Sequence, residues 1–341
     1  MSGVHYVVTG GAGFVGSNLV RYILTTRPDA RVTNVDTLTY AGNLESLADI
    51  DDAPELAGRH RFVHADICDG EAMAGILSGD EVVLHLAAES HVDRSIQADA
   101  PFMRTNVLGT RTLLQAALDA GVRRFVHVST DEVYGELPWR DPAEGHPDDG
   151  APRFTEQTPL APRSPYAASK AASDHLVLAY HHTHDLDIVV TRCSNNYGPY
   201  QYPEKLIPLM ITRALSDEPL PVYGDGQHVR DWIQVLDHVR GILAAADAGE
   251  SGRTYNFGGG AERTNLSVVH AILEALDKPR TLIRHVQDRP GHDRRYAMDA
   301  SRAHDELGWA PTASFDEGLQ GTVAWYLEHR GWWRRVQARQ T

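Results

Sequence analysis

The sequence predicts an α/β fold of the Rossmann type, a doubly wound parallel sheet joined to a smaller mixed α/β C-terminal domain. Three observations lead to it. Short apolar runs alternate with longer amphipathic stretches over the first 195 residues, and a glycine-rich loop follows the first of these runs. After about Gly198 the chain changes to proline-punctuated segments with the turn Gly224-Asp225-Gly226. Strands that alternate with helices at this spacing are typical of a parallel sheet with helices on both faces.

Six apolar runs, several of them rich in valine, are the expected strands of the sheet. Each is short, and their valine content is typical of strands buried on both faces of a parallel sheet. They cover residues 6–9, 32–36, 61–66, 82–86, 125–129 and 188–192.

One stretch, from Leu137 to Pro165, interrupts this rhythm. It is dense in proline, glycine and aspartate and has almost no apolar periodicity. We read it as a long loop, and long loops in compact domains are usually functional or disordered. We place the domain boundary later, with the Rossmann domain over 1–197 and the smaller domain mainly over 198–341. The chain is free to cross between them more than once.

Composition narrows the class of partner and the cell compartment. The 341 residues carry a formal net charge of −14, which argues against a nucleic-acid partner. The amino terminus has neither a basic region nor a long apolar run, so we expect no signal peptide and no membrane anchor. Two cysteines, Cys68 and Cys193, cannot build a disulfide framework. We therefore expect a cytoplasmic protein.

The loop after the first expected strand reads Thr9-Gly10-Gly11-Ala12-Gly13-Phe14-Val15-Gly16 and is followed by a helical pattern. Gly10, Gly13 and Gly16 permit a tight turn and let backbone N–H groups approach a pyrophosphate at the helix N-terminus. Asp36 ends the second expected strand, where a carboxylate can accept hydrogen bonds from ribose hydroxyls and would repel a 2′-phosphate. The pattern favours NAD over NADP as cofactor.

Two further strand ends are weaker candidates for the cofactor. Asp66, at the end of the third expected strand, could reach the adenine. The small residues of Leu86-Ala87-Ala88 would let a dinucleotide pass over them. Each alone is more simply explained by packing, and only beside Asp36 do they become reasonable contacts.

Tyr166 and Lys170 are the first candidates for chemistry. Pro165 is well placed to start a helix, so the two side chains share one face. An ammonium group beside a phenol favours the phenolate and lowers its pKa. A Tyr-x-x-x-Lys pair is common by chance, but after a dinucleotide-binding pattern it indicates a dehydrogenase base.

Thr130, Asp131 and Glu132 follow the fifth expected strand directly. Adjacent carboxylates usually form a solvated turn. These two, however, lie at the carboxyl end of a central strand, where open α/β sheets bind ligands. A simple dehydrogenase needs no such pair, so the carboxylates predict a second proton-transfer step.

At these residues the chain resembles the extended short-chain dehydrogenase/reductases, and among them the family of dTDP-glucose 4,6-dehydratases. The resemblance covers nearly the whole chain, with 137–152 the least similar stretch. It is carried by the Thr-Asp-Glu triplet and by residues 36–43, 87–95, 193–200, 203–208, 224–226, 230–232 and 288–296.

The resemblance implies a three-stage reaction on one tightly bound NAD. Tyr166 would take the proton of the sugar 4-hydroxyl as C4 gives its hydride, with Thr130 beside that oxygen. Glu132 would then remove the C5 proton while Asp131 protonates the departing 6-hydroxyl. Hydride would return to C6. The product would be a 4-keto-6-deoxyhexose nucleotide.

The resemblance also implies binding residues. Further predicted cofactor contacts are Phe14, Val15, Leu38, Thr39, Gly42, Ile67, Ser90, Thr105 and Asn196, beside Tyr166 and Lys170. Predicted substrate contacts are Ser90, Thr130, Asn195, Lys205, Leu206, Arg230, Asn265, Arg289, His292 and Tyr296, with Pro221 and Tyr223 flanking the base.

A homodimer is implied as well, and the helices expected near 106–120 and 166–182 carry apolar residues on more than one side. We predict no metal site, since His181, His182 and His184 lack cysteine or carboxylate partners at ligand spacing. Three alternatives stay open: a sugar-nucleotide 4-epimerase, a UDP-glucuronate decarboxylase and a non-catalytic NAD-binding scaffold. The sequence does not fix the nucleotide base or the pathway that uses the product.

Overall fold

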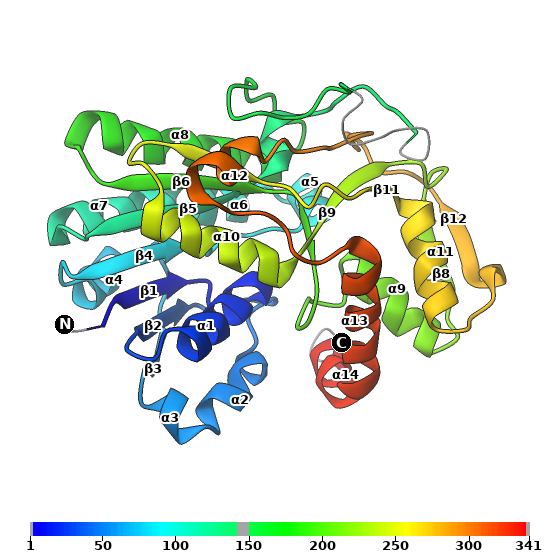
Figure 1. Cartoon of the computed structure of the whole chain (residues 1–341), viewed down its shortest axis with the longest axis horizontal. Helices are drawn as coiled ribbons and strands as arrows, with labels where there is room; N and C mark the ends of the chain where they lie inside the picture. Colours follow the sequence, from blue (N-terminus) through cyan, green and yellow to red (C-terminus); the bar gives the residue numbers. More distant parts are fainter. Residues whose placement is uncertain (1–2, 142–149, 339–341) are drawn as a thin grey trace.

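A seven-stranded parallel sheet forms the larger part of the molecule (Figure 1). The structure is a computed structural model that describes residues 3–141 and 150–338. The strand order is β10-β6-β5-β4-β1-β2-β3, so the order reverses between β1 and β4. Ligands of open α/β sheets bind beyond the carboxyl ends of the strands at such a reversal. The strands are β1 (His5–Thr9), β2 (Arg31–Asp36), β3 (His60–His64), β4 (Glu81–His85), β5 (Arg124–Thr130), β6 (Ile188–Cys193) and β10 (Thr254–Phe257).

Helices cover both faces of this sheet because successive strand side chains point to opposite sides. Val8 and Leu84 pack with α1 (Phe14–Thr26) and α10 (Val235–Ala248) on one face. Val7 and Val83 pack with the helices of the other face. Those helices are α4 (Gly70–Ile76), α7 (Thr110–Ala120) and α8 (Pro165–His184). The predicted doubly wound sheet is confirmed.

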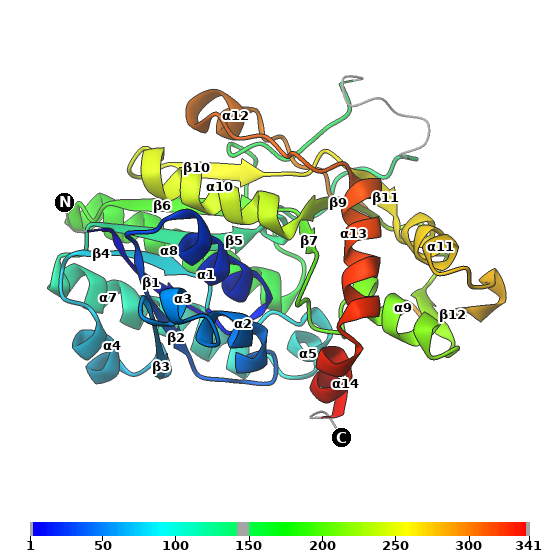
Figure 2. The ribbon, with the colours of Figure 1, turned by 60° about the horizontal axis from the view of Figure 1, so that its bottom comes forward.

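A smaller part, grouped at one end of the large sheet in Figure 2, has its own core. It contains a three-stranded sheet of order β11-β9-β7 and a parallel pair of β12 and β8. Trp332 and Trp333 are buried in this core. Its elements are β7 (Asn195–Tyr197), α9 (Leu206–Leu215), β8 (Leu220–Tyr223), β9 (Val229–Gln234), β11 (Glu262–Thr264), α11 (Asn265–Ala275), β12 (Ile283–Val286), α13 (Phe315–Glu328) and α14 (Arg330–Ala338).

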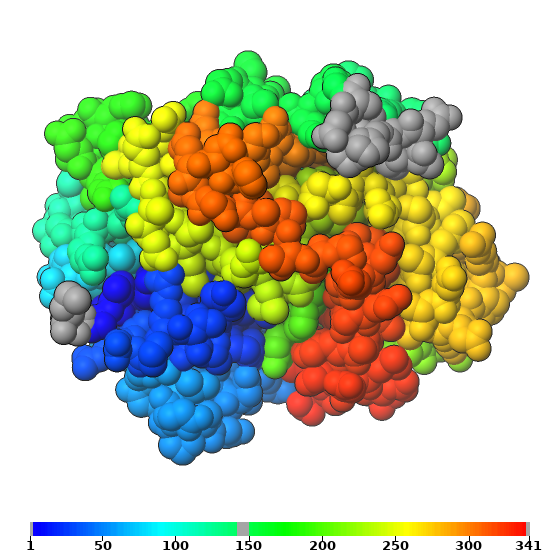
Figure 3. Space-filling view, in the orientation of Figure 1, coloured from blue at the N-terminus to red at the C-terminus, as the bar shows by residue number. Residues whose placement is uncertain are grey.

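The chain crosses between the two parts. It enters the small sheet at β7 and returns to the large sheet with α10 and β10. Figure 3 shows the segment that contains α12 lying across the surface from α10 to α13. The remaining short elements are η1 (Leu44–Leu47), α2 (Ala48–Asp51), α3 (Pro54–Ala57), α5 (Val92–Gln97), α6 (Ala100–Phe102), η2 (Met103–Gly109), η3 (Asp131–Tyr134), η5 (Arg280–Leu282) and α12 (Ser301–Leu307). None of the helices in the described ranges could span a membrane.

Two strand predictions need correction. The third strand ends at His64, so Asp66 lies beyond it rather than at its end. Its neighbour β2 ends at Asp36, which pairs with His64, and no partner strand continues past that point. The seventh strand, β10, lies within the stretch read as smaller domain. Its sequence, Thr-Tyr-Asn-Phe, has no valine-rich run to signal a buried strand.

Between Leu137 and Pro165 the described residues contain neither helix nor strand, apart from a single bridge between Phe154 and Met298. The part of the predicted loop at 142–149 lies outside the described residues. Pro165 begins α8, as predicted.

Candidate active site

The glycine loop lies between β1 and α1 at the reversal point of the sheet. Gly10 adopts a left-handed φ of 73°, and a Cβ there would lie 2.7 Å from the backbone nitrogen of Ala87. A Cβ on Gly16 would lie 2.1 Å from the Gly10 carbonyl oxygen, so α1 packs directly against the turn. The first turn of α1 carries no acidic residue. Its free backbone N–H groups therefore suit an anion.

Asp36 ends β2 and is held by backbone at the edge of this loop. Its carboxylate accepts hydrogen bonds from Ala12 N at 3.0 Å and Leu38 N at 2.8 Å. Burial raises the pKa of the Asp36 carboxyl, and the two backbone N–H groups oppose that rise. The carboxylate is thus fixed before any ligand is bound.

A cavity of about 980 Å³ runs along the carboxyl ends of the strands. Leu38, of the predicted cofactor contacts, faces instead an adjoining cavity of about 870 Å³. The other predicted cofactor residues line the large cavity: Gly10, Gly13, Phe14, Val15, Gly16, Asp36, Thr39, Gly42, Asp66, Ile67, Leu86, Ala87, Ala88, Ser90, Thr105, Tyr166, Lys170 and Asn196. Thr130, Asp131, Glu132, Asn195 and Lys205 line it as well.

Tyr166 and Lys170 project from one face of α8, whose first turn is capped by the Ser164 hydroxyl, which accepts from Ala167 N at 3.1 Å. Both side chains are buried and line the cavity. The Lys170 ammonium group donates to the Val128 carbonyl oxygen at 2.8 Å. That bond ties α8 to β5.

The expected effect of Lys170 on the pKa of Tyr166 is not what the structure shows. Burial raises the pKa of the Tyr166 phenol well above its usual range, and the Glu132 carboxylate raises it further. Burial also lowers the pKa of the Lys170 ammonium group to about 8, although the carboxylate of Asp174 raises it. Desolvation is the largest influence on the pKa of both groups.

Thr130, the last residue of β5, organises the two carboxylates that follow it. Its hydroxyl caps η3 by accepting from Glu132 N at 3.3 Å and donates to the Asp131 carboxylate at 3.2 Å. Asp131 is only 1% exposed, and its second oxygen has no partner among the described residues. A buried carboxylate that lines a cavity and has one oxygen without a partner among the described residues is unlike a solvated turn.

The two carboxyl groups of η3 are set apart by their surroundings. Burial raises the pKa of Asp131 well above its usual range, and Glu132 and Asp231 raise it further. Burial also raises the pKa of Glu132, but Arg289, Lys205 and Arg230 oppose that rise. Neighbouring carboxyls with different environments are suited to act one as acid and one as base.

The three cations that act on Glu132 come from separate segments of the smaller part. Lys205 donates to the Ser90 carbonyl oxygen at 3.0 Å. Arg230, in β9, donates to the Asp293 carbonyl oxygen at 2.8 Å and lies 4.2 Å over the Tyr296 ring. The predicted substrate residues outside the lining of the large cavity are Leu206, Pro221, Tyr223, Arg230, Asn265, Arg289, His292 and Tyr296.

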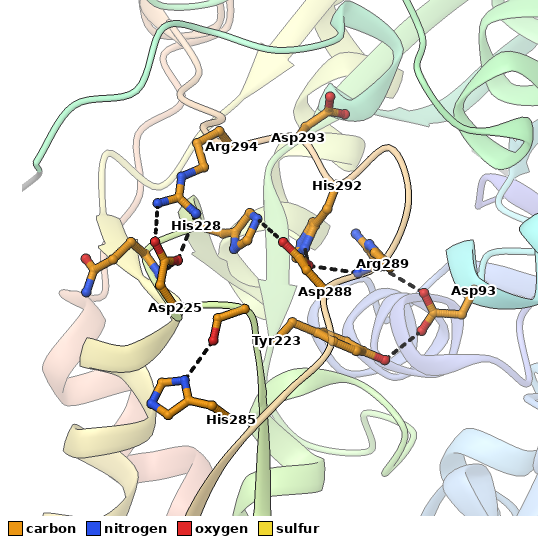
Figure 4. A network of polar contacts seen from close by, with 12 residues as sticks. Asp93, Tyr223, Asp225, His228, His285, Asp288, Arg289, His292, Asp293 and Arg294 are labelled. Atoms are coloured by element: carbon orange, nitrogen blue, oxygen red, sulfur yellow. Dashed lines mark hydrogen bonds and ion pairs between the residues drawn. The ribbon is translucent and has the colours of Figure 1, made fainter.

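Asp93 bridges the two parts of the molecule and was not among the predicted site residues. Its carboxylate accepts from Arg289 at 3.4 Å and from the Tyr223 hydroxyl at 3.2 Å (Figure 4). Asp231 is a second residue that the sequence argument missed. It is 1% exposed, and burial raises its pKa to about 6. Asp93 and Asp231 both lie in segments that carry the family resemblance. The residues next to them in the sequence do not indicate which side chains they contact in the fold.

His228, Asp288 and His292 place three potential metal-ligand atoms within 4.8 Å of one another in the described part of the chain. The Asp288 carboxylate already contacts both rings, at 3.2 and 2.7 Å, and the rings stack at 3.7 Å. Stacked rings do not direct their nitrogens at one point. Burial lowers the pKa of His292, and the positive charges of Arg289 and Arg230 lower it further, so the surroundings are unfavourable to a cation.

Comparisons with known proteins agree with this geometry. The profile of the family described as GDP-mannose 4,6 dehydratase matches residues 7–322. The dTDP-glucose 4,6-dehydratase of Escherichia coli is 50% identical, with 97% of this chain and 95% of that protein covered. The dTDP-glucose 4,6-dehydratase DesIV of Streptomyces venezuelae, solved with NAD bound, has a TM-score of 0.91 at 49% identity over 98% of this chain and all of that one. A UDP-glucose 4-epimerase of Thermotoga maritima is more distant, at 29% identity and a TM-score of 0.84, covering 95% and 99%.

Proposed function

The chain belongs to the dTDP-glucose 4,6-dehydratase family, and we propose that it converts dTDP-glucose to dTDP-4-keto-6-deoxyglucose and water. One observation carries the proposal. The carboxylate pair Asp131 and Glu132, of which Asp131 is buried, shares one cavity with the pair Tyr166 and Lys170. An alcohol oxidation needs only the second pair; elimination of water needs an acid and a base in addition.

The cofactor side of the cavity fits NAD. The Gly10 and Gly16 turn leaves no room for a Cβ, as expected where backbone approaches a pyrophosphate. Asp36, anchored by two backbone N–H groups, is placed to accept from the ribose hydroxyls. Bound NAD would accept a hydride from C4 and return it to C6, and its positive nicotinamide ring would counter the raised pKa of Tyr166.

Oxidation would use the groups of α8 and β5. Tyr166 takes the proton of the 4-hydroxyl as its base, and Thr130 donates a hydrogen bond near the same oxygen. Lys170, held by the Val128 carbonyl, contributes its positive charge to the phenolate. The resulting ketone at C4 makes the C5 proton acidic.

Elimination would use η3. Asp131, with its raised pKa, is protonated and gives its proton to the departing 6-hydroxyl. Glu132 removes the C5 proton as a carboxylate, and Arg289, Lys205 and Arg230 favour that form by opposing the rise in its pKa that burial causes. The C–O bond at C6 breaks, water leaves and a double bond forms between C5 and C6. Hydride return to C6 and a proton at C5 then complete the product.

The nucleotide diphosphate would bind beside the same cations. Arg230 and Arg289 lie where they already act on Glu132, and the amide NH₂ groups of Asn195 and Asn265 would donate to the nucleotide. Tyr223 and Pro221, on β8, would flank the base. His292 and Tyr296 complete this side.

We further propose a homodimer and a cytoplasmic location. Leu108 and Met103, on η2, are 59% and 38% exposed, an apolar surface that a second copy would bury. A monomer by light scattering at micromolar concentration would contradict the first. Both cysteines are free thiols, which suits a reducing compartment.

The test of the function is incubation of the purified protein with dTDP-glucose, followed by detection of the 4-keto chromophore in base. Parallel incubations with UDP- and GDP-linked hexoses measure the preference for the base. With dTDP-glucose we expect the chromophore to form. Mass spectrometry of the product should show a hexose that has lost one water, because its 6-hydroxyl is gone. A C4 epimer that keeps this hydroxyl would overturn the proposal in favour of an epimerase.

A further inference from the structure

We propose that a buried row of side chains, Asp174–Arg192–Tyr134, is a positioning device that fixes the carboxylate pair of η3 relative to Tyr166 and Lys170 of α8. The inference rests on the proposed function, because it assigns these two pairs to two successive steps. Neither Asp131 nor Glu132 is hydrogen-bonded to Tyr166 or Lys170 in the described part of the protein. Beside the Lys170 bond to Val128 of β5, their alignment therefore depends on contacts made by the surrounding residues.

One end of the row is on the helix that carries the oxidation pair. Asp174 lies one turn after Lys170 in α8, on the same face, and is fully buried. Its carboxylate accepts from the Arg192 Nε at 2.8 Å and lies 3.3 Å from the His127 ring nitrogen. Ser173 holds the same ring nitrogen at 3.2 Å.

The other end is on the turn that carries the elimination pair. Arg192 passes from β6 to Tyr134, where its second nitrogen donates to the phenol oxygen at 2.9 Å. Tyr134 is the last residue of η3, which begins at Asp131. Its hydroxyl donates in turn to Asn256 of β10 at 2.8 Å. A single guanidinium group therefore spans from α8 to η3.

Burial makes this row stiff. Arg192 is 4% exposed and Tyr134 is 3% exposed, so neither can exchange its partners for water without opening the core. The Tyr134 ring also stacks on Phe154 at 5.0 Å and belongs to the apolar cluster that includes Ala171 of α8. Charge-assisted, fully buried hydrogen bonds of this kind set geometry more strictly than apolar packing alone.

The consequence concerns the two steps separately. Loosening the row would move Asp131 and Glu132 relative to C5 and C6 of the sugar, while Tyr166 and Lys170 keep their places on α8. Displacement of catalytic groups by about 1 Å can cost on the order of a hundredfold in rate. Elimination should therefore suffer while oxidation at C4 continues.

The test is Tyr134→Phe in the full-length holoenzyme with dTDP-glucose. It removes only the hydroxyl through which Arg192 and Asn256 hold η3. In a quenched single turnover we expect the 4-keto hexose that still has its 6-hydroxyl to accumulate, with elimination slowed about tenfold to a hundredfold. Solvent deuterium should enter at C5 correspondingly late, and the content of bound NAD should match wild type.

Two further variants keep the result unambiguous. Arg192→Lys retains a cation beside Asp174 but loses the second guanidinium nitrogen, which donates to Tyr134. It should therefore also slow elimination while oxidation continues, even if Tyr134→Phe folds poorly. Tyr326→Phe is the matched control, since it removes an equally buried phenol that donates to the Gln201 carbonyl oxygen in the smaller part. It should leave the partition unchanged.

Equal slowing of both steps, an unchanged partition in the Tyr134 and Arg192 variants, or accumulation in the Tyr326 control would overturn the positioning role. Failure of the wild-type protein to release the 4-keto-6-deoxy product would instead overturn the proposed function, so the two failures are distinguishable.

Discussion

On the cofactor side of the cavity Asp36 is held by neighbouring backbone, whereas on the substrate side Arg289, Tyr223 and His292 are held by side-chain carboxylates. Asp36 takes both of its hydrogen bonds from N–H groups close to it in the sequence or in the adjoining loop. Arg289 and Tyr223, by contrast, share the carboxylate of Asp93, and His292 contacts Asp288. The first arrangement needs no rearrangement to bind; the second must exchange side-chain partners for a diphosphate.

The difference matches what each side would hold. A cofactor that is restored in every turnover benefits from a site fixed in advance, because no ordering cost recurs. A substrate that enters and leaves needs cations that are kept in place but can be released. Between the two sides lie Tyr166 with Lys170 and Asp131 with Glu132. The following predictions test whether the two sides act separately.

The largest effect is expected from Tyr166→Phe, between the two sides. The ring is kept, so bound NAD should remain at wild-type content, while loss of the base should lower kcat by about 10²–10⁴-fold. Turnover of dTDP-glucose and NAD released on denaturation measure the two. Tyr180→Phe, on the same helix but bonded to Gln115 away from the cavity, is the control. Near-wild-type turnover of the Tyr166 variant would refute its role.

The carboxylate pair should separate elimination from oxidation. Asp131→Asn removes the proton donor and Glu132→Gln the base at C5, and each should slow loss of water about a hundredfold. In a single turnover the reduced-nicotinamide absorbance should build up and product should appear late. Glu132→Gln should also suppress exchange of the C5 proton with deuterated solvent.

Glu136→Gln serves as the control for this pair, because Glu136 contacts Arg163 and the Arg294 backbone rather than the cavity. If Asp131 and Glu132 formed only a turn, both variants would turn over normally without any build-up. The time course of the reduced-nicotinamide absorbance therefore distinguishes a purely structural turn from a catalytic carboxylate pair.

The sequence predicts the residues of the cofactor side better than the contacts of the substrate side. The glycine turn, Asp36 and the Tyr166–Lys170 spacing are local patterns, so chain order alone brings them to the reversal point of the sheet. Asp93 and Arg289 are separated by 196 positions, and no local pattern pairs them. Likewise the Arg192 contact with Tyr134 depends on strand register.

The misjudged details have physical causes too. Helical spacing brought Lys170 close to Tyr166, but the resulting pKa of the phenol depends on how deeply both are buried, which spacing does not reveal. The strand β10 was missed because its four residues gain their burial from β6 and α10 rather than from their own composition.

A moderate effect is expected from pH. Burial lowers the pKa of Lys170 to about 8, so its ammonium form prevails below that pH and is lost as the pH rises through it. We expect kcat/KM to fall about tenfold per unit well above pH 8. In Lys170→Arg, whose charge does not titrate, whatever activity remains should lose this alkaline fall. A profile flat to pH 10 in wild type would contradict the role of the Lys170 charge.

The smallest effect is expected from Asp93→Asn, and its sign tests the comparison directly. The contact between Asp93 and Arg289 is 3.4 Å long and partly exposed, so it contributes at most about 1 kcal/mol. If the diphosphate must displace this carboxylate, its loss frees Arg289, and KM for dTDP-glucose should fall by less than about fivefold. Because Asp93 contacts Arg289 and Tyr223 rather than the residues of the oxidation step or Asp36, kcat and NAD content should stay at their wild-type values. Asp225→Asn, which breaks the comparable contact with Arg294, should leave KM unchanged. A rise in KM would mean that Asp93 orients Arg289 for the substrate instead of competing with it, and the substrate side would then be as fixed in advance as the cofactor side.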